Sequence, residues 1–148
     1  MARRPASAKK ALSEANLAAL GAERLAALLM ETASPALKRR LRLELAAEAG
    51  AADLAFELDK RLAALEASKT RVSWRKRPEL LTELKALEVM IAERLAALDQ
   101  SLALDRLVAW FDLYPALTRR VQDPKGELAL IFDAASSALV VVGADGAI

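Results

Sequence analysis

Apolar side chains, most of them leucine, recur at steps of three and four residues along residues 13–139. That period places them on one face of a helix. Alanine and leucine together supply 62 of the 148 residues, and both lose little side-chain freedom in a helix. The sequence therefore predicts an all-α protein. We expect six or seven helices, packed as antiparallel hairpins in a helical bundle or a short solenoid.

Glycine, proline, serine and aspartate separate the apolar segments and mark where helices begin and end. The expected helices cover residues 13–20, 22–33, 35–49, 51–67, 78–98, about 100–121 and 124–139. Pro115 should kink the sixth helix, because its ring removes one backbone hydrogen bond. We expect a disordered basic N-terminus at 1–12, a single all-helical domain at 13–139, and a frayed C-terminal tail at 140–148.

The helical period also predicts which side chains of each helix point inward. On four of the helices the expected inward residues are Leu37, Leu41 and Leu45; Leu54, Ala55, Leu58, Leu62 and Leu65; Leu80, Leu84, Leu87, Ile91, Leu95 and Leu98; and Leu104, Leu107, Val108, Phe111 and Tyr114.

One pentapeptide, Arg-Leu-Ala-Ala-Leu, occurs three times, beginning at Arg24, Arg61 and Arg94. The spacings of 37 and 33 residues resemble the period of helix-pair repeats, about 33–47 residues. A word made of the commonest residues also recurs by chance, and the flanking residues do not align. We interpret the copies as three helix segments with a shared packing role.

The chain has no histidine and no cysteine, which excludes disulfides, thiolate catalysis and the usual zinc, haem and non-haem iron ligand sets. We therefore expect no cofactor, no metal and no catalytic residue, and a non-enzymatic protein. The basic start is not followed by a secretory core, and no apolar run approaches the ~20 residues that span a bilayer. We expect a cytoplasmic, bacterial protein with no membrane partner.

The formal charge of +2 conceals an asymmetry. Residues 1–77 carry 16 Lys and Arg against 9 Asp and Glu, whereas residues 78–148 carry 6 against 11. A basic half beside an acidic half favours either phosphate binding or attraction between the halves or between copies.

The densest basic segment, residues 69–77, places five cations around one indole: Lys69, Arg71, Trp74, Arg75, Lys76 and Arg77. Such a cluster could grip a nucleic-acid backbone while the tryptophan stacks on a base. It is more often a connector whose tryptophan packs over helix ends and whose cations face solvent or acidic groups. The connector is our preferred interpretation.

A second basic group, Lys38, Arg39 and Arg42, opens the second of two helices joined by a short turn. Helix-turn-helix proteins read DNA with a helix in this position. The turn lacks the usual glycine, so the more common interpretation is an ordinary helix pair with a charged surface.

Two further groups are candidates for chemistry. The pairs Glu44/Glu48 and Glu79/Glu83 each lie one turn apart on a helix, but glutamates that balance arginine or lysine explain them better than a metal. The aromatic run at 110–114 is more typical of a core than of a ligand pocket. Asp112 within it could bond a basic residue near Trp74.

The segments Leu20–Leu25, Lys38–Ala46 and Trp74–Arg77, with Trp110–Leu113, resemble the N-terminal part of an uncharacterised family of helical proteins from alphaproteobacteria, a domain of unknown function. The resemblance covers roughly residues 12–133. It implies an all-helical, solenoid-like protein and supplies no activity. Members of that family are considerably longer, and the segment from Val140 onward departs from their pattern.

These observations favour a non-catalytic helical scaffold or protein-interaction module, with a protein partner or self-association through the last helix. Such a module would present an apolar groove or an open helix face to a partner helix. The alternative is a nucleic-acid-binding protein that uses the basic N-terminal half.

Overall fold

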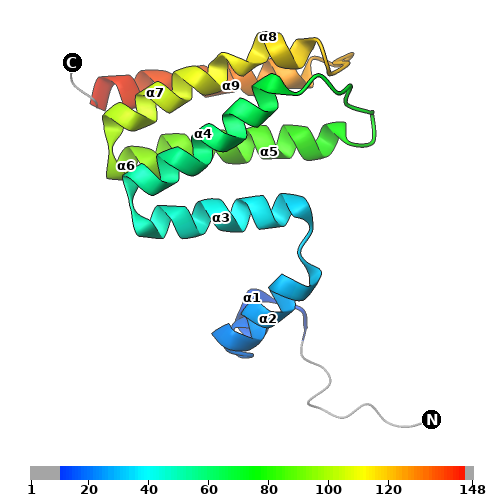
Figure 1. Ribbon diagram of the computed structural model, residues 1–148, viewed down its shortest axis with the longest axis vertical. Coiled ribbons are helices and arrows are strands. Elements are labelled where there is room, and N and C mark those ends of the chain that lie inside the picture. The colour runs from blue at the N-terminus through cyan, green and yellow to red at the C-terminus, as the bar shows by residue number, and fades with distance from the viewer. Residues whose placement is uncertain (1–10, 146–148) are drawn as a thin grey trace. The chain divides into compact units, whose positions relative to one another are not determined.

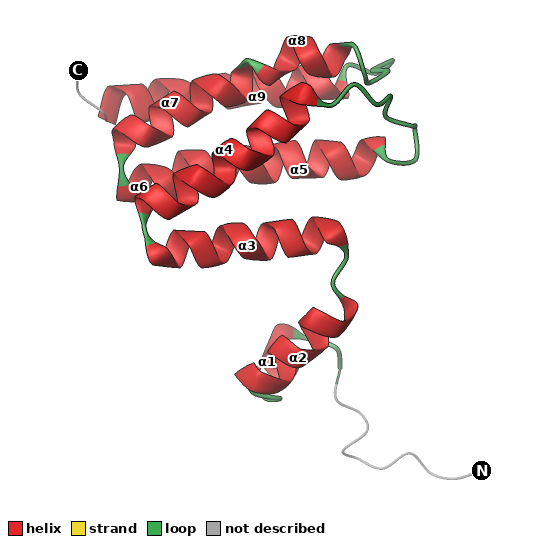
Figure 2. Cartoon of the chain, in the orientation of Figure 1, coloured by secondary structure: helices red, strands yellow, loops and turns green. Residues whose placement is uncertain are grey.

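The computed structural model describes residues 11–145, and every regular element in that range is a helix (Figures 1 and 2). The elements are α1 (Glu14–Ala18), α2 (Ala22–Thr32), α3 (Pro35–Ala49), α4 (Ala51–Ala67), α5 (Arg77–Val89), the π-helical segment η2 (Met90–Leu95), α6 (Ala96–Leu98), α7 (Gln100–Phe111), α8 (Leu113–Thr118) and α9 (Glu127–Asp145). Because α5, η2 and α6 are continuous and only Asp112 separates α7 from α8, these make seven helices. The all-α prediction is confirmed. No helix within 11–145 has the length and apolarity needed to cross a bilayer.

The chain divides into two compact units, residues 1–38 and residues 39–148. The physical reason lies in the first two helices, because neither α1 nor α2 contains a buried side chain. Ser13 begins α1 as expected, and its Oγ accepts the Asn16 N–H at 3.2 Å. The disorder expected for 1–12 concerns mainly residues 1–10, which lie outside the described range.

The second unit is built around α4 and the long helix formed by α5, η2 and α6. All five side chains predicted to point inward from α4 are buried, and so are all but the last of the six predicted for the long helix. α7 packs against α4, η2 and α9, and α9 also lies along α5 (Figure 1). These contacts produce one continuous apolar core.

Trp110 is the largest fully buried side chain of the second unit. Its Nε1–H donates to the Leu84 carbonyl of α5 at 3.0 Å, and its ring stacks on Phe132 of α9 with centroids 4.3 Å apart. The predicted inward face of this helix is therefore wrong in part. Leu107 is buried as expected, but Val108 and Tyr114 are exposed and the face is completed by Ala103, Trp110, Leu113 and Leu117. Burying the indole removes more apolar area from water than burying the valine.

The inward face of α3 also differs from the prediction. Leu45 is 72% exposed, and the buried side chains are Leu43, Ala46 and Ala47. Arg39 and Glu44, which flank the buried face of α3, form ion pairs with Glu83 of α5 and Arg94 of η2. Gly50 then turns the chain directly into α4 with φ of +135°, a conformation that side chains with a Cβ rarely adopt.

The C-terminal helix begins later and runs further than expected. Asp123 acts as its cap, because the carboxylate accepts the Leu128 N–H at 3.1 Å, but Pro124 lies in a turn before the helix. The helix continues to Asp145, and Val142 is buried. The prediction of a frayed tail from residue 140 is therefore wrong as far as residue 145, and residues 146–148 lie outside the described range.

The contrast between two leucines tests this packing. We expect Leu58→Ala, in the core of α4, to lower the free energy of unfolding by about 2–5 kcal/mol because it leaves a cavity. Leu45→Ala should change it by less than about 0.5 kcal/mol, since that side chain is exposed. Urea unfolding followed by circular dichroism measures both. Equal losses would show that α3 is rotated the other way.

Candidate interaction surfaces

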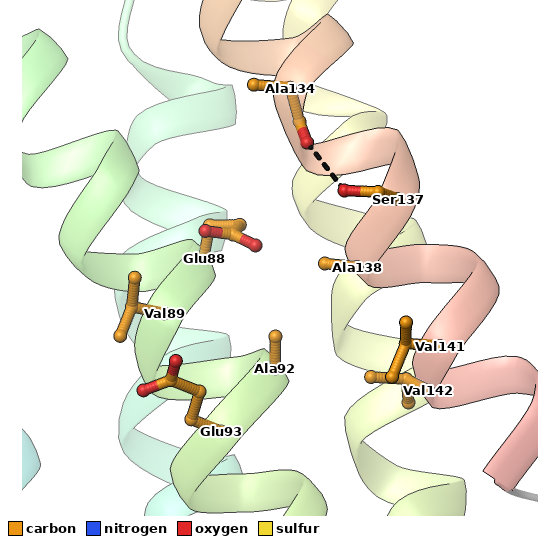
Figure 3. Close-up of a pocket in the computed structure, with 9 residues that line it drawn as sticks. All are labelled: Glu88, Val89, Ala92, Glu93, Ala134, Ser137, Ala138, Val141 and Val142. Atoms are coloured by element: carbon orange, nitrogen blue, oxygen red, sulfur yellow. Dashed lines mark hydrogen bonds between the residues drawn. The ribbon is translucent and has the colours of Figure 1, made fainter.

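A shallow groove of about 270 Å³ runs between the long helix and α9 (Figure 3). Short side chains form much of its lining, which leaves the space between the helices unfilled. The lining residues are Glu88, Val89, Ala92 and Glu93 from α5 and η2, and Ala134, Ser137, Ala138, Val141 and Val142 from α9. The lining combines small and apolar groups with two carboxylates.

Beside the groove, α9 exposes an apolar stripe. Leu130 is 64% exposed and Val141 is 58% exposed, and Ala134 and Ser137 lie between them at helical spacing. Val89 continues the apolar surface across the groove on α5. Isolated exposed apolar residues are normal, whereas a contiguous set marks a contact surface.

Glu88 is the polar side chain that projects from α5 toward α9 (Figure 3). Burial raises the pKa of its carboxyl, the nearby Glu93 raises it further, and Lys85 partly offsets both. No hydrogen-bond donor to this carboxylate is found within residues 11–145. Glu88 is therefore a partly desolvated carboxylate without a hydrogen-bonded partner at a groove.

Three of the four carboxylates singled out in the sequence, Glu44, Glu48 and Glu83, serve as ion-pair partners. Glu83 receives Arg61 Nη2 at 2.6 Å and Arg39 Nε at 3.2 Å, and Arg94 contacts Glu44 at 2.8 Å and Glu48 at 3.6 Å. The preferred interpretation, glutamates that balance arginines, is confirmed for these residues. In the described part of the chain no three carboxylates converge on a metal-sized site.

Arg61 and Arg94 are the first residues of the second and third pentapeptide copies. Both anchor one helix to another, and the leucines that follow them, Leu62 and Leu95, are buried. The first copy, at Arg24, lies on α2, which contributes no buried side chain. Two of the three copies thus have the shared packing role that we expected.

Residues 68–76 form a non-helical connector between α4 and α5, and Arg77 begins α5. The expectation that Trp74 packs over helix ends is wrong, because Trp74 is 75% exposed, and its ring centroid lies 5.4 Å from the Arg75 guanidinium. The connector is held instead by its backbone: Arg120 Nε donates to the Thr70 carbonyl at 2.7 Å, and the Val72 N–H donates to the Arg120 carbonyl at 2.9 Å.

The cations of this segment differ in their surroundings. Lys69, Arg71, Arg75 and Lys76 are exposed. Arg77 is partly buried and donates to the Gln122 carbonyl at 3.0 Å. The expected bond from Asp112 to this segment is not formed, since no ion pair found within residues 11–145 involves Asp112. Four cations and an indole therefore remain open to solvent.

The other basic group is not a uniform exposed face. Lys38 and Arg42 are exposed, but Arg39 is turned toward Glu83. In the aromatic run, Trp110 is buried and Phe111 is partly buried beside it, as preferred, whereas Tyr114 is exposed. The rings of Phe111 and Tyr114 lie 6.1 and 5.1 Å, between centroids, from the ring of Phe132.

Sequence reasoning missed the groove and Glu88. The sequence did contain a pattern that indicates this surface. Lys85, Glu88, Val89 and Ala92 follow the i, i+3, i+4, i+7 spacing of one helix face, beside the buried leucines of the same helix. The pairing of that face with α9 could not be read from either helix alone. Because residues 140–148 were expected to be a frayed tail, Val141 was not predicted to lie on the surface of a helix.

The chain belongs to a family of unknown function, DUF6880, whose family model matches residues 7–147. The match takes in every helix described above. Comparison with curated proteins and with solved structures gave no match.

The raised pKa of Glu88 has a consequence for stability. The folded state holds this proton more tightly than the unfolded state, so its stabilising contribution is complete at low pH and is lost as pH rises through the folded pKa. We expect Glu88→Gln to be more stable than the wild type at pH 7, and the difference to shrink below about pH 4.

Urea unfolding at both pH values measures the effect. Glu66→Gln on the exposed surface of α4 is the matched control and should show no comparable gain at pH 7. A Glu88→Gln variant that is less stable than the wild type at pH 7 would mean that the carboxylate has a partner in solution.

Proposed function

We propose that this member of the family is a non-catalytic helical scaffold or protein-interaction module, and that the surface between α5 and α9 is where it binds its partner. The observation that carries the proposal is the exposed stripe of α9, formed by Leu130, Ala134, Ser137 and Val141, beside an unfilled groove. We call this surface, formed by Lys85, Glu88, Val89, Ala92 and Glu93 together with Leu130, Ala134, Ser137 and Val141, the α5–α9 face.

The shape and chemistry of the α5–α9 face suit a helix. Small residues at the centre, Ala92, Ala134 and Ala138, allow a partner backbone to approach closely. Larger apolar residues on either side, Val89 and Val141, can bury area against it. Helix-in-groove recognition uses side chains at this spacing.

The ionisable groups support the same proposal. Glu83, Arg61 and Arg94 hold helices of the second unit together, which accounts for their clustering without chemistry on a substrate. Glu88, in contrast, has no such partner within the described residues, and its charge would select a basic group on the bound molecule.

The setting that we propose is the cytoplasm of a bacterium, in keeping with the absence of cysteine and of a secretory core from the sequence. The wider proposal from the resemblance, similarity to the N-terminal part of an alphaproteobacterial family, also rests on sequence alone.

A pull-down with the tagged chain tests the function. We expect Leu130→Glu to weaken capture of partner proteins at least about tenfold, because it places a charge in an apolar contact. The matched control is Leu45→Glu on α3, another highly exposed leucine, which should bind as the wild type does. If Leu130→Glu captured the same proteins in the same amounts as the wild type, the result would contradict the proposal.

A second candidate, nucleic-acid binding, is favoured by one specific observation. Trp74 stands exposed among Lys69, Arg71, Arg75 and Lys76 on a connector that its backbone contacts hold in place. An exposed indole flanked by cations can stack on a base while the cations neutralise phosphates.

Salt dependence tests this candidate. If single-stranded nucleic acid binds there, the double variant Arg75→Gln, Lys76→Gln should reduce the slope of log affinity against log salt by about 1.4. Trp74→Ala should cost about 1–3 kcal/mol of binding. Lys60→Gln, an exposed cation of α4 outside the connector, is the control. Absence of binding at low salt removes the candidate.

A further inference from the structure

We infer that the nucleic-acid site considered above is built from two segments, the connector at 68–76 and the loop at 119–126 between α8 and α9, and that Arg120 positions the connector within it. The ligand is a single strand that contacts both segments. The inference rests on the nucleic-acid candidate of the proposed function. It adds the second segment, the residue that joins the two segments, and the class of nucleic acid.

Arg120 holds the two segments together at one end of the second unit (Figure 1). Its Nε donates to the Thr70 carbonyl at 2.7 Å, and its Nη1 donates to the Leu65 carbonyl at 3.2 Å. The carbonyl of Arg120 accepts the Val72 N–H at 2.9 Å. One residue of the loop thus bonds to the connector and to the end of α4 at three points.

A fourth bond closes the other side of the connector. Arg77, the first residue of α5, donates from Nη1 to the Gln122 carbonyl of the loop at 3.0 Å. The bonds to the loop therefore lie both before and after Trp74 in the sequence. They hold the backbone of the connector while the indole itself stays exposed.

The two segments together are strongly basic. The connector carries four exposed cations, and the loop adds Arg119, Arg120 and Lys125, of which Arg119 and Lys125 are exposed. Within residues 11–145 none of these seven cations takes part in an ion pair. The one carboxylate in the two segments, Asp123, caps α9 by accepting the Leu128 N–H. A polyanion that crosses from one segment to the other therefore gains contacts that the connector alone does not offer.

The exposed indole selects the class of polyanion. Trp74 is 75% exposed, and the Arg75 guanidinium lies 5.4 Å from its ring centroid. A base can stack on such a ring when it is not already stacked inside a duplex, so a single strand gains more than a duplex does. An anionic lipid surface and an acidic peptide offer charge without a base. They are the competing ligands, and the experiment separates them.

Salt titration tests the second segment. The probe is a labelled oligothymidylate of about twelve nucleotides, and fluorescence anisotropy gives its affinity at each salt concentration. We expect the double variant Arg119→Gln, Lys125→Gln to reduce the slope of log affinity against log salt by about 1.4, because each lost phosphate contact on a single strand removes about 0.7. Lys60→Gln is the matched control and should leave the slope unchanged.

A double-mutant cycle tests the role of Arg120. Arg120→Lys keeps the charge but replaces the planar guanidinium that bonds to two carbonyls. We expect it to weaken binding about fivefold, the lower end of the loss from one stacked base, with the salt slope unchanged. Trp74→Ala should then cost less in the Arg120→Lys background than in the wild type, because both changes act on the same stacked base. Circular dichroism should show that each variant is folded.

Several outcomes would overturn the inference. If Arg75→Gln, Lys76→Gln lowers the salt slope and Arg119→Gln, Lys125→Gln does not, the second segment is wrong while the nucleic-acid candidate stands. Additive losses in the cycle would show that Arg120 does not position Trp74. Equal affinity for a duplex of the same length, or tighter binding to phosphatidylserine vesicles or to an oligoglutamate peptide, would exclude the single strand as the ligand. Absence of binding at low salt removes both the candidate and the inference.

Discussion

The burial of Trp110 is the interaction on which the second unit depends most. Its indole lies on α7, donates a hydrogen bond to a carbonyl of α5 and stacks on a ring of α9, so one side chain joins three helices. A buried indole N–H without an acceptor would be costly, and only a narrow range of helix positions satisfies it. Trp110 thus helps to set the distance between α5 and α9, and with it the width of the groove beside Glu88, although Trp110 does not line the groove.

The sequence predicted the helices well where one face carried an unambiguous pattern. On α4 all five predicted core residues are buried, because no other side of that helix offers comparable apolar area. On α3 and α7 more than one face carries apolar side chains, and contacts with the other helices determine which face is buried. Leu45 is exposed, while Arg39 and Glu44 of the same helix form ion pairs with neighbouring helices. Val108 is exposed, while the larger Trp110 is buried. The division of the chain at residue 38 could not be predicted from the sequence, because α1 and α2 have the apolar spacing of helices but no buried side chain.

The candidate site was much less accessible to sequence reasoning. Charge runs drew attention to the connector around Trp74 and to the start of α3, because like charges in succession are visible in a sequence. The α5–α9 face depends on which helix lies beside which, and that information is carried by long-range packing. The ion pair of Arg61 with Glu83 likewise joins residues whose spacing alone gives no hint of contact.

The π-helical segment η2 has a consequence for how this helix can change in length. A turn that bonds i to i+5 holds one residue more than an α-turn, so the residues after it are rotated relative to an uninterrupted helix. Leu98 follows the buried Ile91 and Leu95 at the spacing of one helix face, yet it is 49% exposed. Removal of one residue from 90–95 would restore a regular α-helix while the residues on either side keep their orientation, so Leu98 would stay exposed. The helix can thus absorb a one-residue deletion, and the rearrangement would be confined to η2, which contributes Ala92 and Glu93 to the groove.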